Sequence, residues 1–520
     1  MKKYKCLYNH EMLINFTTQT PYQSYDDPVG KAQFEGYIEE LTDTQVDVIM
    51  CCPTAWRLPI YYSEVNPVWT TWGLDVKSPL PEADWKYFDK VFERVRRYMI
   101  SENYEDPLQI TIDTARKIGR DVFFSYRMND HHYTHFNGDQ VPPTMDPLWR
   151  DNPQWRLPSM GGIRSAMDYM IDGVREWYSR ILEELIDNYD VDGLELDFMR
   201  ASDYFRPEDT EAGLTILTDF VSSIRSMLNE YSAIRNKALK LCVRVPWSVE
   251  RCRNMGVDIV RWQDEGLVDM INVSSHFRTT AEVDIRGFRQ AMPEAVLYGE
   301  LHFSSGSAHS PAPGVGGTRK TTREIYETTA HSFLEQGASG ISLFNFCYIR
   351  DHHFHEPRLR CYTIAEPQFN VLKNITNRKY LGNKPKHYNF CGGFGQLPVK
   401  FPSPEPFCFE LYLAEESYDQ YSKAILRLQF RESGVLPDAV DASLNDTKLK
   451  MIPGSGELFQ PESNEGLAYP LEIFFFEVPI SVLKHGVNNL KLSVSTLGEF
   501  FLSCLKRNEL CGLELALYKN

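Results

Sequence analysis

Two carboxylates separated by a single residue, Glu195 and Asp197, stand in a stretch with the pattern of a buried strand. The apolar residues Leu194, Leu196 and Phe198 alternate with them. Because side chains on a strand alternate between its two faces, both acids share one face and the apolar residues take the other. Two buried acids cost free energy unless they are paired or used in chemistry. The stretch therefore predicts either a functional site or an internal layer of salt bridges.

Further charged side chains lie at or just after the ends of other strand-like runs. They are the acids Glu11, Asp130, Glu300 and Asp351, the arginines Arg127, Arg200, Arg244 and Arg350, and the histidines His10, His131, His132, His276, His302, His352 and His353. If the strands form a barrel, their C-terminal ends meet at one mouth. Such a group suits a substrate with many hydroxyl groups, and the cleavage of a glycosidic bond requires a pair of carboxylates.

The predicted catalytic residues are Asp197, Glu300 and Glu195. Asp197 lies nearer the C-terminal end of its strand, so Glu195 is deeper and placed to orient Asp197 or to bind a hydroxyl group. Glu300 ends an apolar run and supplies the second carboxylate. A gap of about 5–5.5 Å between Asp197 and Glu300 would imply retention of the anomeric configuration, which analogy favours, and about 6.5–9.5 Å would imply inversion. The sequence does not assign which carboxylate is the acid and which the nucleophile.

Ten further residues are predicted to bind the substrate, because their side chains can bond hydroxyl groups or stack on sugar rings. They are Asn129, Asp130, His131, His132, Arg200, Arg244, Trp247, His302, Asn345 and Trp56. Since Glu195 repels Asp197, the substitution Asp197→Asn is expected to leave the melting temperature unchanged or raised.

The histidine pairs leave a metal site open as an alternative. His352, His353 and His355 are closely spaced, as are His131 and His132, and zinc accepts imidazole ligands. Adjacent histidines on a strand face opposite ways, however, which disfavours a shared metal ion. We therefore expect neither a metal nor a cofactor. A serine nucleophile in the motif Gly-x-Ser-x-Gly is absent as well.

Strand-like and helix-like segments alternate along the first 380 or so residues. The predicted strands are Tyr4–Glu11, Val46–Cys52, Asp121–Arg127, Val191–Arg200, Lys240–Trp247, Val268–Ser274, Ala295–His302 and Gly340–Phe346. Predicted helices include Ala166–Asn188 and two pieces within Trp85–Ile118 that break near Asp106-Pro107. Eight strands, each followed by helix-length sequence, predict a (β/α)8 TIM barrel in the class of α/β proteins.

The pattern changes after the barrel segment. We predict a catalytic barrel at 1–387, a linker rich in glycine and proline at 388–406, and a smaller all-β sandwich at 407–520. Short strand-like runs separated by turn-rich sequence support the sandwich. It contains no cluster of acids and histidines, so it is expected to contribute no catalytic group.

Composition restricts the partners. Among 520 residues the net charge is -16, which disfavours a nucleic-acid partner, and no run is apolar enough to predict a membrane span. Eleven cysteines without a Cys-x-x-Cys pair predict reduced thiols. The expected partner is a carbohydrate substrate. The chain as given has no signal peptide, which fits the cytoplasm, or the periplasm or outside if an export signal was removed; oligomeric state stays open.

Three motifs carry a family resemblance: 192–200 (Asp-Gly-Leu-Glu-Leu-Asp-Phe-Met-Arg), 127–132 (Arg-Met-Asn-Asp-His-His) and 243–246 (Val-Arg-Val-Pro). Together they resemble glycoside-hydrolase-like barrel proteins of polysaccharide-degrading bacteria, over most of the first 380 residues. The resemblance implies a (β/α)8 barrel, hydrolysis of glycosidic bonds, and an accessory β-sandwich. It does not name a sugar.

The sequence departs from better-known hydrolase patterns. Chitinase-type barrels end strand four with Asp-x-x-Asp-x-Asp-x-Glu, and here the last position is Met199. Galactosidase-like barrels match Asp197 but expect an acid after strand six, where this chain has Ser275 and His276. The leading hypothesis is a glycoside hydrolase. The alternatives are a carbohydrate-binding barrel without catalysis and a metal-dependent hydrolase that uses the histidines.

Overall fold

The computed structural model describes sixteen parts of the chain. They are residues 3–16, 28–71, 87–130, 132, 146–158, 166–200, 203–276, 278–305, 321–346, 369–390, 396–401, 403, 405–431, 439–454, 471–494 and 509–519. By its internal contacts the chain divides into two compact units. The first contains residues 1–276, 286–298 and 342–355, and the second contains 277–285, 299–341 and 356–520.

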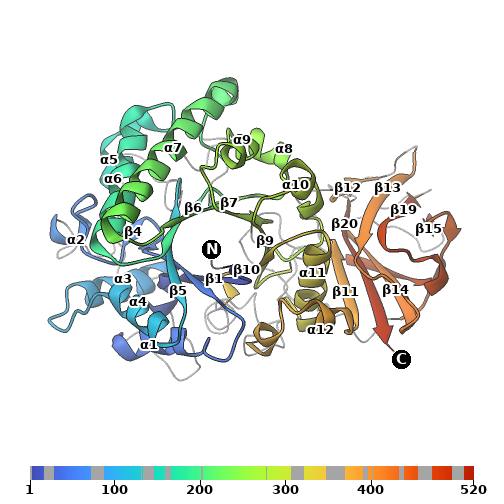
Figure 1. Cartoon of the computed structure of the whole chain (residues 1–520). Coiled ribbons are helices and arrows are strands. Elements are labelled where there is room, and N and C mark those ends of the chain that lie inside the picture. The colour runs from blue at the N-terminus through green and yellow to red at the C-terminus, as the bar shows by residue number, and fades with distance from the viewer. Residues whose placement is uncertain are drawn as a thin grey trace. The chain divides into compact units, whose positions relative to one another are not determined.

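Eight parallel strands close into a barrel with the order β1-β10-β9-β8-β7-β6-β5-β2 (Figure 1). Their bounds are β1 Cys6–Glu11, β2 Val48–Cys52, β5 Asp121–Arg127, β6 Gly193–Asp197, β7 Lys240–Pro246, β8 Met270–Ser274, β9 Leu297–His302 and β10 Gly340–Phe344. The predicted (β/α)8 barrel is confirmed, and each predicted strand overlaps one of these. A short hairpin of β3 (Thr54–Ala55) and β4 (Leu58–Pro59) follows β2.

The register of the strands identifies the side chains that fill the barrel. Met50 pairs with Phe123, Phe123 with Gly193, and Cys242 with Met270. These apolar side chains belong to one buried cluster together with Tyr298. Because side chains alternate along a strand, residues two and four positions further on also point inward. The inward positions above this apolar layer carry Glu195 and Asp197 on β6.

Gly193 is required where β6 begins. A Cβ atom at this position would lie 2.3 Å from the backbone oxygen of Lys240 and 2.8 Å from the Phe123 ring. Both neighbours pair with Gly193 in the barrel sheet. A larger residue would therefore push β6 away from β5 and β7, and would displace the two carboxylates that follow on the same strand.

Helices surround the barrel strands in Figure 1. Their bounds are α1 Lys31–Glu39, α2 Val68–Thr71, α3 Tyr87–Met99, α4 Pro107–Lys117, α5 Pro147–Asp151, α6 Asp172–Asn188, α7 Thr210–Arg235, α8 Val249–Arg253, α9 Ile259–Asp264, α10 Ile285–Ala291, α11 Arg323–Glu335 and α12 Arg378–Gly382. The predicted break near Asp106-Pro107 is confirmed, because the Asp106 side chain caps α4 by accepting from the backbone N–H groups of Leu108 and Gln109.

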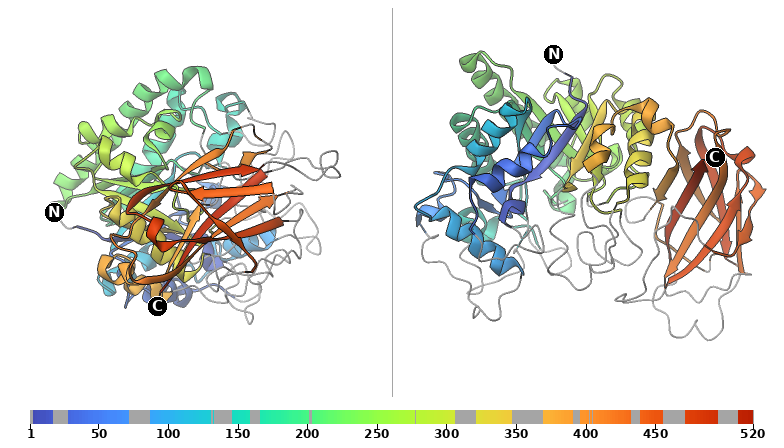
Figure 2. Two further views of the ribbon diagram at one scale, coloured as in Figure 1. Left: turned by 90° about the vertical axis from the view of Figure 1, so that its right-hand side faces the viewer. Right: turned by 90° about the horizontal axis from the view of Figure 1, so that it is seen from below.

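The C-terminal part of the chain forms antiparallel sheets, as predicted for a β-sandwich (Figure 2, orange to red). One sheet has the order β11-β20-β14-β18-β17, with β12 also paired to β20, and the other has the order β13-β19-β15-β16. The bounds are β11 Lys386–Phe390, β12 Val399–Lys400, β13 Phe407–Leu413, β14 Tyr421–Arg431, β15 Val440–Leu444, β16 Thr447–Lys448, β17 Lys450–Ile452, β18 Leu471–Val478, β19 Gly486–Val494 and β20 Glu509–Lys519. Side chains from both sheets share one apolar core that includes Phe409, Leu428 and Leu515.

Two stretches differ from the sequence prediction. Within the predicted linker 388–406, residues Tyr388–Phe390 belong to β11 and Val399–Lys400 form β12, and both strands pair with β20. Helix α6 begins at Asp172 rather than at the predicted Ala166. The backbone N–H and C=O groups of Met167 are instead hydrogen-bonded to the Asn129 side chain.

Within the described ranges, none of the helices is both long enough and apolar enough to cross a membrane. The cysteines of these ranges, seven in number, are free thiols.

Candidate active site

Asp197, the last residue of β6, forms a buried ion pair with Arg244 of β7. Arg244 Nη1 lies 2.9 Å from Asp197 Oδ1 and 3.1 Å from Oδ2, and both side chains are 1% exposed. The backbone N–H of Met199 also donates to Oδ1, at 2.8 Å. The pair forms because Asp197 and Arg244 are direct neighbours in the strand register. Oδ1 thus accepts two N–H groups, whereas Oδ2 accepts one from the described residues.

Arg244 is itself held from other elements of the same unit. Its Nη2 donates to Ser274 Oγ at 3.0 Å and to the backbone oxygen of His276 at 3.4 Å. The guanidinium lies 3.6 Å from the centre of the Phe344 ring, which is a cation–π distance. Arg244 was predicted to bind substrate, and these contacts give it a further task, which is to fix the orientation of the Asp197 carboxylate.

The ion pair reverses one sequence expectation. Substituting Asp197 by Asn was expected to relieve repulsion from Glu195 and so to maintain or raise the melting temperature. Because Arg244 is buried against Asp197, the substitution instead leaves a buried cation without its counter-ion, which typically costs about 3–5 kcal/mol. We therefore expect a lower melting temperature instead, since the partner of Asp197 lies on another strand and was not considered.

Glu195 lies one inward position below Asp197, and its carboxyl group contacts side chains from β5, β7 and β8. Ser125 Oγ donates to Oε1 at 2.7 Å, and Asn272 Nδ2 and Cys242 Sγ lie 3.2 and 3.5 Å from Oε2. Burial raises the pKa of Glu195 to about 7, and the charge of Asp197 adds to this, while Ser125, Arg244 and Asn272 oppose it. The structure thus places Glu195 in the barrel interior, beneath Asp197, as predicted.

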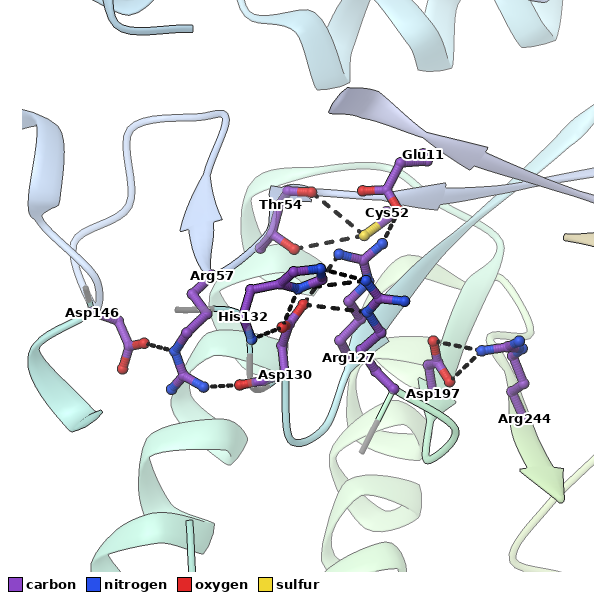
Figure 3. Close-up of polar contacts among 11 residues, drawn as sticks. Glu11, Cys52, Thr54, Arg57, Arg127, Asp130, His132, Asp146, Asp197 and Arg244 are labelled. Carbon is purple, nitrogen blue, oxygen red and sulfur yellow. Dashed lines mark hydrogen bonds and ion pairs between the residues drawn. The ribbon is translucent and has the colours of Figure 1, made fainter. Parts of the chain in front are cut away.

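A second group of charges, here called the mouth cluster, consists of Glu11, Arg127, Asp130, His132 and Arg200. Figure 3 labels the first four of these residues. Arg127 forms ion pairs with Glu11 of β1 and, through Nη1, with Asp130 Oδ2 at 3.1 Å. Asp130 Oδ1 lies 2.6 Å from His132 Nδ1, and Arg200 Nε lies 3.9 Å from Asp130 Oδ2. These contacts join the C-terminal ends of β1, β5 and β6.

Electrostatics in the mouth cluster fixes the charge of Asp130. Burial opposes ionisation of this carboxyl, but His132, Arg127 and Arg200 outweigh it and hold the pKa of Asp130 well below its usual range. Burial also lowers the pKa of His132 to about 3, and the positive charges of Arg200 and Arg127 reinforce burial against the opposing effect of Asp130. At neutral pH the cluster therefore contains an anionic Asp130 and an uncharged His132.

A small cavity adjoins Asp130 on the side of β5. Its lining includes Trp56, Arg57, Tyr126 and Asp146, and its volume is about 20 Å³. That volume holds about one water molecule, so this cavity is not a sugar subsite in itself. Arg57 lines this cavity. Its guanidinium is paired with Asp146 and donates to the backbone oxygen of Asp130. Arg57 and Asp146 thereby hold the turn that carries the mouth cluster.

Glu300 and His302 lie on β9, and both are buried. They have the same strand parity as Tyr298, whose side chain belongs to the interior apolar cluster. Tyr298, Glu300 and His302 therefore occupy successive inward positions of β9. His302 Nδ1 accepts the backbone N–H of Ser304 at 3.1 Å. The pairing of Glu300 with Asp197 remains a prediction.

Asn129 and Trp56, both predicted substrate ligands, are buried in protein contacts. Asn129 Nδ2 donates to the backbone oxygens of Met167 and Asp203, each at 2.9 Å, and Oδ1 accepts the N–H of Met167 at 3.0 Å. Its amide thus ties the end of β5 to two later segments. Trp56 is 3% exposed and has a left-handed backbone with φ of 56°. These contacts indicate supporting roles, while contact with substrate stays a prediction for both.

The remaining predicted ligands lie at other strand ends. Trp247 follows β7 and is partly buried, with the Arg251 guanidinium 5.8 Å from its ring. Asn345 follows β10 with φ of 51° and is buried. His131 lies outside the described residues. Among the predicted site residues, direct contacts therefore join Asp197 to Arg244 and, in a second group, Asp130 to His132 and Arg200.

Within the sixteen described parts, no group of three or more histidine, cysteine, aspartate or glutamate side chains is arranged to hold a metal ion. The histidines at 352, 353 and 355, on which the metal alternative depended, lie outside these parts. The metal-dependent hydrolase is accordingly neither supported nor excluded by the described side chains.

Several residues of the site were missed as site residues. Ser125, Asn272 and Cys242 bond Glu195, and Ser274 bonds Arg244. The period of two along β5, β7 and β8 was a signal that could have found them, since each occupies an inward position. Arg57 and Asp146 had no such signal, because both lie outside the barrel strands and they are 89 positions apart in the sequence.

Comparisons with known proteins complete the description. No protein-family model matches the sequence, and neither does any curated protein. Among solved structures, the chain is similar to alpha-L-fucosidase isoenzyme 2 from Paenibacillus thiaminolyticus, with 14% identity and a TM-score of 0.42 over 73% of this chain and 49% of the fucosidase. This chain thus spans about half the length of that enzyme.

Two further similar structures are an alpha-amylase from Geobacillus thermoleovorans (11% identity, TM-score 0.40, 95% of this chain and 100% of the amylase) and a glycoside hydrolase family 18 N-acetylglucosaminidase from Paenibacillus barengoltzii (10% identity, TM-score 0.38, 72% and 99%). These neighbours are glycoside hydrolases, the class that the sequence resembles. At such identities and TM-scores they assign neither a substrate nor catalytic residues to this chain.

Proposed function

We propose that this chain hydrolyses glycosidic bonds of a carbohydrate at the C-terminal end of its barrel. The observation that carries the proposal is the geometry of Asp197. Its carboxylate ends β6 and is oriented by Arg244 and by the backbone N–H of Met199, while Oδ2 accepts a single N–H from the described residues. A carboxylate oxygen can accept about two hydrogen bonds, so Oδ2 keeps capacity for a reacting group.

Asp197 and Glu300 are assigned different roles in this proposal. A nucleophile, or a base that activates water, must act as an anion, and an ion-paired carboxylate suits that role. Glu300, the second carboxylate that the sequence predicts, is then assigned as the proton donor to the leaving oxygen. Glu195 supports Asp197 from below.

The mouth cluster supports the same function. Arg200 and His132 are more exposed than the other charged groups around them, with 14% and 21% of their side-chain surface accessible. Polar side chains at the ends of barrel strands are where substrates bind in enzymes of this architecture. Hydroxyl groups of a sugar can accept hydrogen bonds from a guanidinium held there.

The proposal is tested by turnover and by chemical rescue. The purified chain is screened against aryl glycosides and oligosaccharides of varied sugar and linkage, and the anomer of the first product is read by proton NMR. If Asp197 is a nucleophile, Asp197→Gly is inactive and sodium azide restores turnover with formation of a glycosyl azide. Inversion would instead identify Asp197 as a base. Full activity of both Asp197→Asn and Glu300→Gln would refute the assignment.

A second candidate is a carbohydrate-binding barrel without catalysis. It is favoured by the protein contacts of Asp197 and Glu195, because an internal salt-bridge layer would show such contacts as well. Calorimetry separates the two. Oligosaccharide binding without turnover on any tested linkage, unaffected by Asp197→Asn, would support the binding barrel. Activity that is lost with a chelator and restored by a metal would instead support the metal-dependent hydrolase.

A further inference from the structure

Three arginines lie in the charged region at the C-terminal end of the barrel, and their surroundings differ. Arg127 and Arg244 are 5% and 1% exposed, and each forms an ion pair with a carboxylate from a barrel strand. Arg200 is 14% exposed and follows Asp197 by three residues. It is therefore the arginine of the three with most surface available to a ligand.

The orientation of Arg200 depends on His132. Arg200 Nη2 contacts His132 Nε2, and Arg200 Nε lies 3.9 Å from Asp130 Oδ2. A guanidinium has donors and no acceptor, so Nε2 of the imidazole must be the accepting nitrogen. The imidazole proton is therefore assigned to Nδ1, which donates to Asp130 Oδ1 at 2.6 Å.

Asp130 is in turn fixed from several sides. Its Oδ1 accepts the backbone N–H of His132 at 2.8 Å, its Oδ2 is paired with Arg127, and its backbone oxygen accepts from Arg57. A chain of contacts thus runs from a fixed carboxylate through a neutral imidazole to the guanidinium of Arg200. In this chain the carboxylate accepts, the imidazole donates through Nδ1 and accepts through Nε2, and the guanidinium donates.

We propose that Asp130 and His132 form a fixed relay that positions Arg200, and that Arg200 binds hydroxyl groups of the substrate next to Asp197. The inference rests on the proposed function for the identity of the ligand. It assigns His132 as a positioning residue, which acts through Arg200 and neither donates nor accepts a proton in the reaction. The described charged groups that face His132 are Asp130, Arg127 and Arg200.

The state of His132 is tested without any substrate. In protein labelled with nitrogen-15, the His132 signals are identified as those missing from the His132→Gln variant. The expected result is a neutral ring with the proton on Nδ1 at every pH from about 5 to 8, because burial and two arginines disfavour the imidazolium. A ring that titrates near its ordinary pKa, or that carries the proton on Nε2, would overturn the inference.

The binding role is tested with a matched pair of variants. Gln retains an N–H that can donate to Asp130 and an oxygen that can accept from Arg200, whereas His132→Leu has neither. We expect His132→Leu to raise KM about tenfold, or to weaken oligosaccharide binding by the same factor, with kcat within about twofold. His132→Gln should restore most of the loss. Equal losses in both variants, or a loss in kcat with an altered pH profile, would contradict the proposed role.

Failure of the proposed function gives a different pattern. A wild-type chain that binds an oligosaccharide without cleaving it refutes hydrolysis, and the dissociation constants of the two His132 variants still decide the role of Arg200. A wild-type chain that neither binds nor cleaves any tested glycan overturns the binding role together with the proposed function.

Discussion

Two clusters built from the same kinds of residue occur in different parts of the chain. In the barrel, Asp130 contacts His132 and Arg200 at the ends of strands. In the second unit, Glu415 contacts His331 of α11 at 3.5 Å and Lys386 of β11 at 3.4 Å, and Tyr388 donates to its other oxygen at 2.6 Å. We call the second group the sealed cluster, and it consists of Glu415, His331, Lys386 and Tyr388.

The clusters differ in access to solvent and in how their polar atoms are used. Lys386 is fully buried, and its Nζ also donates to the backbone oxygen of Leu381 at 2.7 Å. Tyr388 both donates to Glu415 and accepts from the backbone N–H of Ala414. His132 and Arg200 in contrast keep part of their surface exposed. A cluster of a carboxylate, a histidine and a cation is therefore not enough to identify a binding site. The side chains must also be exposed at the ends of strands.

The largest expected effect is that of Asp197→Asn on catalysis. Removing a group that acts in the transition state typically costs at least about a hundredfold in rate. The same substitution leaves Arg244 without its buried counter-ion, so the melting temperature should fall as well. Steady-state kinetics and calorimetry measure the two effects on one preparation. The control is Asp190→Asn at an exposed ion pair, and a stable Asp197→Asn protein with normal turnover would show that Asp197 is neither catalytic nor structural.

A substitution in the sealed cluster should lower the stability of the fold without changing the affinity for substrate. Burial opposes ionisation of Glu415, but His331, Lys386 and Tyr388 hold its pKa below the usual value. Glu415→Gln removes this anion and leaves Lys386 buried without it, so we expect a loss of about 3–5 kcal/mol. KM of the folded enzyme should not change. Calorimetry and kinetics at a temperature below unfolding check this, with the exposed neighbour Glu416→Gln as control. A raised KM with normal stability would make this cluster a second site.

Glu195, in the barrel interior, is expected to make the stability of the folded chain depend on pH. Its pKa is about 7 in the folded chain and 4.5 ordinarily, chiefly through burial, so the folded state holds its proton more tightly. The stability that this proton contributes is fully present below about pH 4.5 and is lost as pH rises through 7. The difference of about 2.5 pKa units corresponds to about 3 kcal/mol.

The measurement is the stability difference between Glu195→Gln and the native chain from pH 4.5 to 8. We expect the variant to gain about 3 kcal/mol relative to the native chain across this interval, because its amide does not titrate. The exposed Glu176→Gln serves as control. A difference that is independent of pH would mean that Glu195 is ionised throughout the interval.

Strand positions in the barrel were predictable because inward and outward positions alternate regularly. β5 has the predicted bounds, and the remaining barrel strands begin and end within a few residues of their predictions. Glu195 and Asp197 were placed on one face of β6 by the same rule. Local pattern alone was sufficient there, since the period of two is a property of consecutive residues.

The partners of these residues were not predictable from local pattern. Arg244 follows Asp197 by 47 positions, and only the parallel register of β6 and β7 makes the two neighbours. Asn129 had the residue type of a ligand, but backbone groups 38 and 74 residues away use its amide. Strand β11 was assigned partly to a linker because sequence rich in glycine and proline follows it, although Lys386, His387 and Asn389 belong to the strand. They are buried through contacts with distant residues, as between His387 and Glu514.

The smallest expected effect is at Asp190, which like Glu415 contacts two basic side chains. Arg116 and Lys237 contact its carboxylate at 2.5 and 2.8 Å, but 57% of the Asp190 side chain is exposed. Burial slightly opposes ionisation, and the two cations lower the pKa of Asp190 below its usual value. Its contribution to stability is therefore present above the ordinary pKa of 3.8 and is lost as pH falls through the lower folded value.

Solvent screening should make the Asp190 contribution less than about 1 kcal/mol, and Lys237 keeps a second partner in Asp192 at 2.9 Å when Asp190 is replaced. Asp190→Asn is thus expected to lower the free energy of unfolding by a few tenths of a kcal/mol at low salt. At about 1 M salt the Debye length falls to about 3 Å, and the difference should vanish. Glu415→Gln should keep most of its effect under the same conditions, because its partners are buried. If salt abolished both effects equally, burial would not be what distinguishes the sealed cluster from an exposed ion pair.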